Sequence, residues 1–217
     1  MTLLPIKQIA FTIGITFVGV FAGKANAITI DFDNDANGDP INAPELFSNQ
    51  TTQLTNEFAS LGITFDGGGV DNAGEILNAS TFTSGALSDP NIYTFIRSAS
   101  NSFTASFAEP ILDFSINASG SGIDASFFLE AFDADTNSLG TASVNSLGAG
   151  FGLLSFSDPS GNIFSVTVTE TSGNPGVLVF DDLTFEPVPF EAETSVALAL
   201  LGGYMGVKKF RQRQAKG

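Results

Sequence analysis

The chain of 217 residues contains no histidine, no cysteine and no tryptophan. It therefore lacks the parts of a Ser-His-Asp triad, a thiol nucleophile, a disulfide, a zinc site and an iron–sulfur cluster. Basic residues are scarce as well, with 8 Lys and Arg against 23 Asp and Glu, for a net charge of −15. Because nucleic-acid binding depends on cations at the phosphates, we expect no nucleic-acid partner. Cations and neutral ligands are the classes that this composition favours.

The few basic residues are concentrated at the ends of the chain. Between Ile28 and Phe190 there are 21 acidic residues and one basic residue, Arg97, a net charge of −20. Ion pairs can therefore neutralise almost none of these carboxylates. Each must be solvated, hydrogen-bonded to backbone N–H groups, or neutralised by a bound metal ion. The chain as a whole is 43% hydrophobic and contains 22 Phe, so it is expected to bury a sizeable core.

Residues 1–27 have the features of a secretory signal peptide. A basic Lys7 precedes an apolar run of about 15 residues, which is shorter than the roughly 20 residues of a membrane span. Ala25 and Ala27 then form the small-x-small pattern that signal peptidase recognises. We expect cleavage after Ala27 and export of a mature chain that begins at Ile28.

Residues 187–217 form a three-part tail. A proline motif ending in Pro189, Phe190 and Glu191 is followed by an uncharged apolar run over Val196–Val207 and by five basic residues at the end of the chain. The run is short for a permanent span, which favours transient insertion into the inner membrane, with the cations on the cytoplasmic side. The alternative is an ordinary single-span anchor.

This order of motif, apolar run and basic cluster resembles the PEP-CTERM sorting signal of bacterial surface proteins. The usual Val-Pro-Glu-Pro is replaced by Val-Pro-Phe-Glu over residues 188–191, which resembles variant tails of this class in cyanobacteria. The resemblance implies processing by an exosortase-type enzyme. It also implies a location outside the cell or on the envelope surface, after transient anchoring in the membrane.

The middle segment, residues 28–186, has the pattern of an all-β fold. Short runs rich in Phe, Val, Ile and Thr alternate with clusters of Gly, Asn, Asp and Ser, which predicts a two-sheet, jelly-roll-like β-sandwich of about ten strands. A single short helix is expected within Thr51–Ser60, where Leu54 and Phe58 lie four residues apart before Gly62. The predicted strands are Ile28–Asp33, Gly62–Asp66, Ile92–Arg97, Phe103–Phe107, Leu112–Ile116, Ala125–Phe132, Thr141–Val144, Leu153–Phe156, Phe164–Thr169 and Val177–Phe185.

Two motifs at the ends of this segment resemble β-sandwich domains of PEP-CTERM proteins. They are Phe58–Phe65 (FASLGITF) and Phe180–Phe185 (FDDLTF). Such domains are similar to galactose-binding-like jelly rolls and carbohydrate-binding modules. The resemblance implies that the first and last strands pair and hold a structural calcium ion, which would join Asp31 or Asp33 to Asp181 or Asp182.

The residues themselves offer two places for such an ion. Around Gly38, the residues Asp33, Asp35 and Asn37 follow the alternating pattern of the first half of a calcium loop, but the closing Glu of an EF-hand is missing. A solvated turn explains the same residues. A similar motif at Asp133, Asp135 and Asn137 favours a hairpin tip over a metal site.

Asp181 is the second place. In strict alternation it shares a strand face with four apolar residues, Val177, Val179, Leu183 and Phe185, where a lone carboxylate is costly without compensation. Two interpretations are open: a metal ion compensates the charge, or a β-bulge at Asp181 and Asp182 turns both side chains outward.

The function predicted from the sequence is that of a non-enzymatic surface or matrix protein associated with extracellular polysaccharide. The alternative is a calcium-dependent carbohydrate-binding module, and the less favoured one is a glycosidase that uses two carboxylates. Residues 28–186, which we call the body, contain no Trp and a single Tyr, Tyr93. Trp and Tyr are the usual platforms on which sugar rings stack.

Overall fold

A computed structural model describes residues 26–45, 52–66, 74–94, 101–173 and 178–189. Ala27 and Pro189 lie at the two ends of the described chain, and Ala27 is exposed. Outside the described residues lie the predicted signal run, Ala25, Phe190, Glu191 and the apolar tail. Within the described part, no helix has the length and apolar character needed to cross a membrane.

The described chain is almost entirely β-structure. Its only helices are two three-residue 3-10 turns, η1 (Ala59–Leu61) and η2 (Ala79–Thr81). The eleven strands are β1 (Ile28–Ile30), β2 (Thr52–Gln53), β3 (Ile63–Asp66), β4 (Glu75–Asn78), β5 (Asn91–Thr94), β6 (Ser102–Ser119), β7 (Ala125–Phe132), β8 (Ser138–Ser146), β9 (Gly152–Ser157), β10 (Ile163–Glu170) and β11 (Val179–Pro187).

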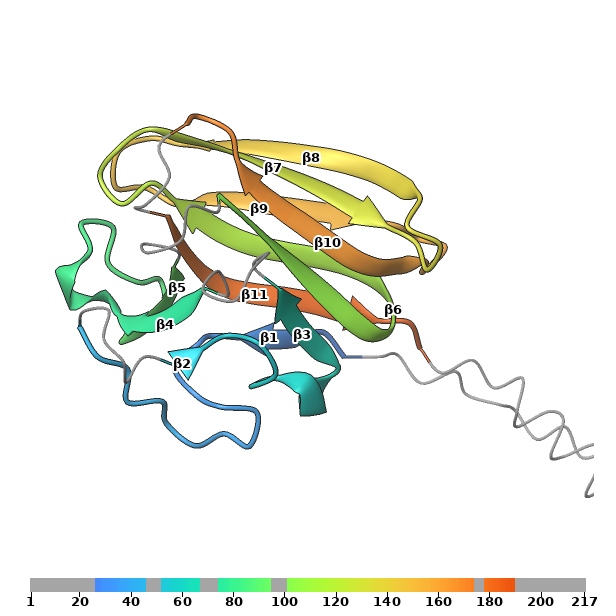
Figure 1. Ribbon diagram of the computed structural model, residues 1–217, viewed down its shortest axis with the longest axis horizontal. Helices are drawn as coiled ribbons and strands as arrows, with labels where there is room; N and C mark the ends of the chain where they lie inside the picture. The colour runs from blue at the N-terminus through green and yellow to red at the C-terminus, as the bar shows by residue number, and fades with distance from the viewer. Residues whose placement is uncertain (1–25, 46–51, 67–73, 95–100, 174–177, 190–217) are drawn as a thin grey trace, which may run out of the picture. The chain divides into compact units, whose positions relative to one another are not determined.

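The long strand β6 belongs to both layers of the fold. Its first half pairs with β10 and β3, and β10 continues through β7 to β8. Its second half pairs with β11 and β9, and β11 continues through β5 to β4 and β2. Figure 1 shows β7, β8 and β10 in one layer and β1, β5 and β11 in the other. The predicted all-β sandwich is thus present, with antiparallel pairing throughout.

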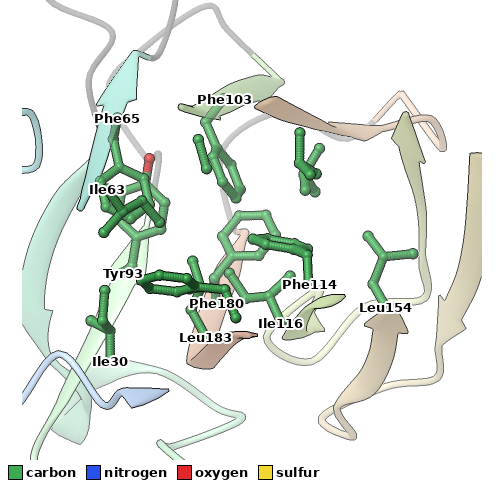
Figure 2. Packing of buried hydrophobic residues seen from close by; sticks show 14 of the residues in the cluster. Ile30, Ile63, Phe65, Tyr93, Phe103, Phe114, Ile116, Leu154, Phe180 and Leu183 are labelled. Carbon is green, nitrogen blue, oxygen red and sulfur yellow. The ribbon is translucent and has the colours of Figure 1, made fainter. Parts of the chain in front are cut away.

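One cluster of buried side chains fills the space between the layers. The ring of Tyr93 lies at its centre, 5.6 Å from the ring of Phe32 and 5.3 Å from that of Phe103, centroid to centroid. Figure 2 shows the rings of Tyr93, Phe103 and Phe180 packed with aliphatic residues such as Ile116 and Leu183. Among the described residues, every core side chain lies between Ile30 and Phe185, within the compact unit Lys24–Val188. We infer that this unit folds without the chain on either side.

The predicted helix within Thr51–Ser60 is wrong. Leu54 and Phe58 are both buried as expected, but only the turn Ala59–Leu61 is helical, and Gly62 ends it at φ 88°. The preceding residues instead pair with β4, and the Leu54 N–H donates to the carbonyl of Gly74. Pairing along a sheet edge therefore outweighs a helical pattern of only two apolar residues.

Other strand boundaries differ because of bulges and bends. The strands predicted at Phe103–Phe107 and Leu112–Ile116 are one strand, β6, and the short β2 and β4 were missed. The alternation expected at Phe164 also fails: Ile163 and Val166 are buried while Phe164 is partly exposed, because the register shifts between Ile163 and Ser165.

Candidate functional site

Two short strands share one edge of β11. β5 pairs with Val179 and Phe180, and β1 pairs with Leu183–Phe185. Pairing of the first and last strands was predicted, and it is confirmed. Between these segments β11 contains a bulge, where the register to β6 shifts after Asp181 and Asp182 adopts a φ of 48°. The edge of the sheet is therefore interrupted at Asp181 and Asp182.

The Asp181 carboxylate closes this interruption. Asp181 Oδ2 accepts hydrogen bonds from the N–H groups of Leu87 (2.6 Å) and Ser88 (3.1 Å). Oδ1 accepts from the Asp182 N–H (2.8 Å) and the Ser88 hydroxyl (3.0 Å). Asp181 is fully buried, and burial, partly offset by these N–H donors, raises its pKa to about 6. The carboxylate thus replaces the missing strand partner and attaches the loop after η2 to β11.

The bulge also changes which side of β11 each residue faces. Phe180, Leu183 and Phe185 belong to the main core, whereas Val179 packs in a second, small cluster with Leu77, Ala79 and Ile92. The assumption that Asp181 shares one face with Val179, Leu183 and Phe185 is therefore wrong. The predicted bulge is present, but it does not turn Asp181 outward, because the loop after η2 covers that side chain.

Further carboxylates lie near the bulge at Asp181 and Asp182. Burial raises the pKa of Asp33, and the like charges of Asp31, Asp89 and Asp182 raise it further, against a lowering hydrogen bond from the Asn91 N–H at 2.7 Å. None of the described residues is lysine, arginine or histidine, so no described side chain neutralises this group. We call Asp31, Asp33, Asp89 and Asp182 the acidic cluster.

The oxygens of the acidic cluster are not equally available. Asp31 accepts hydrogen bonds from the N–H groups of Asp33 and Asn34 and from the Asn34 amide. The Asp182 carboxylate accepts none from the described residues, and Asp33 has a second oxygen free of them. Within the described ranges, no three acidic side chains surround a common point. An ion here would thus require the carboxylates of Asp33 and Asp182 to turn toward it.

The predicted loop around Gly38 has its own hydrogen bonds. Asp35 Oδ1 accepts from the N–H groups of Asn37 (2.8 Å) and Asp39 (3.0 Å), and Gly38 takes a φ of 85°. Hydrogen bonds from the Asp39 and Asn37 N–H groups lower the pKa of Asp35. These contacts are those expected of a solvated turn. They bind Asp35 and Asn37 to atoms of their own loop.

The second acidic motif is the tip of the β7–β8 hairpin, as predicted. Asp133 accepts hydrogen bonds from the N–H groups of Asp135 and Asn137 and from the Asn137 amide. These bonds, chiefly those from Asn137, lower the pKa of Asp133.

The outer face of the other layer presents a regular array of polar side chains. It is formed by β3, the first half of β6, β10, β7 and β8, and cross-strand rows such as Thr104–Thr167–Glu130–Thr141 run across it. The hydroxyls of Thr104 and Thr167 lie 2.9 Å apart. We call this surface the hydroxyl face; its members are Thr64, Ser102, Thr104, Ser106, Ser126, Phe128, Glu130, Phe132, Thr141, Ser143, Asn145, Ser165, Thr167 and Thr169, none of which is buried.

Two aromatic side chains interrupt this polar array. Phe128 and Phe132 belong to neither core cluster and remain partly exposed, on either side of Glu130 along β7. Tyr93, by contrast, is fully buried. The sequence pattern contained this signal, because Phe127, Leu129 and Ala131 alternate with Phe128 and Phe132 and cannot share their face.

A scan against protein-family models finds no match, and a search of curated proteins finds none either. Among solved structures, the chain is similar to the CBM22-1 xylan-binding domain of Xyn10C from Paenibacillus barcinonensis, with 10% identity, TM-score 0.43 and coverage of 75% of this chain and 95% of that one. It is also similar to TmCBM61 in complex with β-1,4-galactotriose, with 16% identity, TM-score 0.41 and coverage of 63% and 98%.

A third similarity is to the CBM22-1 and GH10 modules of xylanase 10B from Clostridium thermocellum, with 12% identity and TM-score 0.41. The match covers 74% of this chain but only 28% of that one. The structural similarity is thus to carbohydrate-binding β-sandwiches. At these identities and TM-scores it carries no argument about what the present chain binds, which has to be inferred from its own residues.

Proposed function

We propose that the β-sandwich is a non-catalytic module that binds a neutral extracellular polysaccharide through the hydroxyl face. The observation that carries the proposal is the position of Phe128 and Phe132 outside both core clusters, within an array of serine and threonine hydroxyls. An extended sugar chain presents both apolar ring faces and hydroxyl groups. A surface that combines aromatic rings with hydrogen-bonding side chains matches both features.

The spacing and the charge of this face support the same ligand class. Phe128 and Phe132 lie on one side of β7 at positions i and i+4, about 13 Å apart at the rise of an antiparallel strand. The rings can therefore stack on sugar units separated along one chain. With a net charge of −20, the body would repel an acidic polymer, which favours a neutral one.

We expect the double variant Phe128→Ala/Phe132→Ala to lose polysaccharide binding. Each ring–sugar contact removed should weaken the affinity by about tenfold, since an aromatic contact is worth about 1 kcal/mol or more. The measurement is affinity electrophoresis of residues 28–189 through gels that contain a panel of neutral polysaccharides, followed by calorimetry with the polymer that retards the protein.

The matched control is Leu153→Ala, which removes an exposed apolar side chain (58% exposed) from β9 in the other layer. Its retardation should equal that of the unchanged protein. Retardation that survives the double phenylalanine variant, or that disappears in the control as well, would contradict this assignment.

We further propose that the chain is exported and sorted at its two ends. The support is the order of sequence features: a signal-like segment before Ile28, and a proline motif, apolar run and basic cluster after Glu186. Signal peptidase would cut after Ala27, and an exosortase-type enzyme would cut near Pro189. A mass spectrum of the exported protein that shows residues 1–27 still attached would overturn the first cut, and an intact basic terminus would overturn the second.

We also propose that calcium binds at the acidic cluster, with Asp33 and Asp182 as its carboxylate ligands. The support is chemical: oxygen donors are the ligands of calcium, several carboxylates repel one another there, and the described residues leave oxygens of Asp33 and Asp182 without a hydrogen bond. Asp181 has a different part, because hydrogen-bond donors occupy both of its oxygens. The ion would offset the mutual repulsion beside the pairing of β1 with β11.

A further inference from the structure

Strand β8 ends the β10–β7–β8 part of the sandwich and leaves one edge open. It pairs with β7 along its length, and no strand within the described ranges pairs with its other edge. β9 follows β8 in the chain but lies against the core-facing side of β8. Gly140 of β8 approaches the Phe156 ring of β9 so closely that a Cβ atom at Gly140 would lie 2.7 Å from it. The backbone N–H and C=O groups on the outer edge of β8 are therefore available to another strand.

This edge lacks the devices that usually prevent sheet edges from pairing. Natural edges carry charges, prolines or bulges, or they are short. The segment Ser138–Ser157, which contains β8, its following turn and β9, has neither a charged residue nor a proline. The single bulge lies at the start of β8, and the register from Gly140 to Ser146 is continuous, which leaves roughly 20 Å of regular strand.

The edge of β8 differs from most of the protein surface in having no charged side chains. The body carries a net charge of −20, so most of its surfaces repel a second copy. The side chains that β8 presents to solvent, Thr141, Ser143 and Asn145, are exposed and uncharged. Two copies that meet through β8 would place no like charges opposite each other. They would instead align side chains that can donate and accept hydrogen bonds.

We propose that two copies of the chain associate by antiparallel pairing of their β8 strands. A two-fold axis perpendicular to the sheet relates the copies, so that the same segment of each contributes to the interface. The pairing joins the two β3–β6–β10–β7–β8 layers into one continuous sheet. It does not rest on the proposed sugar binding, because the pairing is made by the backbone edge of β8, although Thr141, Ser143 and Asn145 also belong to the hydroxyl face.

The test is the association of residues 28–189 in solution, measured by sedimentation equilibrium over a range of protein concentrations. We expect a monomer–dimer equilibrium that tightens with salt, since about 1 M salt shortens the Debye length to about 3 Å and screens the repulsion between the bodies. Ser143→Lys places a charge at the edge and should weaken the dimer by about tenfold or more. Ser60→Lys makes the same charge change at an exposed residue of η1 and should leave the dimer intact.

Because the chain has no cysteine, cross-linking can locate the interface. Residues directly opposite in an antiparallel pair have Cα atoms about 4.5–5.5 Å apart, within reach of a disulfide. Among Thr141→Cys, Ser143→Cys and Asn145→Cys, oxidation should give the covalent dimer fastest at the position nearest the two-fold axis. Ser60→Cys should react far more slowly.

Two results would overturn the proposal. One is a monomer at every concentration in high salt. The other is a dimer that Ser143→Lys leaves unchanged and whose cysteine variants on β8 cross-link no faster than Ser60→Cys, because the contact would then lie on another surface. The unfolding midpoint of each variant checks that it is folded, and a variant that fails this check is replaced by the cysteine series.

Discussion

Replacing Asp181 by alanine is expected to lower the free energy of unfolding by about 3 kcal/mol. The variant removes the acceptor of three backbone N–H groups and one hydroxyl, in a side chain that is fully buried. Leaving buried donors without an acceptor costs about 1–3 kcal/mol each, while the relief of the buried charge returns part of that cost. Chemical denaturation of residues 28–189 in a chelator measures the difference.

Asp182→Asn is the matched control, because it removes one charge from the adjacent residue, whose carboxylate accepts no hydrogen bond from the described residues. Asn also tolerates the positive φ of that position. Its unfolding free energy should change little in the chelator. A loss in Asp182→Asn as large as that in Asp181→Ala would show that charge, and not the hydrogen bonds of the loop, determines stability here.

The pH dependence provides an independent check on Asp181. Its pKa is raised from the ordinary value to about 6 in the folded protein, so the folded state binds the proton more tightly than the unfolded chain does. The stabilisation from protonation is fully present below pH 3.8 and is lost as the pH rises through about 6. In the chelator, the unchanged protein should therefore gain stability between pH 7 and pH 5. Asp181→Ala should gain less over the same range.

Calcium is expected to raise the unfolding midpoint of the same protein at neutral pH. A ligand that binds only the folded state stabilises it by about 2.7 kcal/mol at a free concentration one hundred times its dissociation constant. Differential scanning calorimetry in calcium and in chelator measures the shift. Asp33→Asn and Asp182→Asn should each reduce it, because each neutralises a proposed ligand.

The control for calcium is Asp135→Asn, which changes the same residue type at the exposed tip of the β7–β8 hairpin. Calcium should raise the unfolding midpoint of this variant as much as it raises that of the unchanged protein. Equal midpoints in calcium and chelator would overturn the calcium site while leaving the assignment of the hydroxyl face untouched, since the two lie in different layers.

The strands with clear alternation could be predicted from the sequence, whereas irregular features could not. Ala125–Phe132 alternates buried and partly exposed residues without interruption, and the strand has those bounds. Asp181 illustrates the limit, because its face depends on a bulge that shifts the register by one residue. No local pattern reveals that the loop after η2 returns to donate to it, more than 90 residues away in sequence.

For the acidic cluster and the edge of β8, too, only part could be predicted from the sequence. Spacing indicated Asp33 and strand alternation indicated Asp181, whereas the resemblance to carbohydrate-binding jelly rolls joined them with Asp31 and Asp182. Asp89 was not identified. Which oxygens remain free follows only from the hydrogen bonds of Asp31, Asp35 and Asp181. The open edge of β8 was missed altogether. Strand order determines which strand lies last in a sheet, and the sequence pattern of an edge strand such as Ser138–Ser146 is the same alternation as that of an internal one.

The position of β11 has a mechanical consequence for a force applied to the C-terminal end of the sandwich. β11 ends at Pro187, where the tail begins, and along its course it is hydrogen-bonded to β6 on one edge and to β5 and then β1 on the other. Antiparallel hydrogen bonds run perpendicular to the strands, so traction along β11 loads them together in shear. A pull on that end would thus meet many bonds at once, and not a strand that peels away one bond at a time.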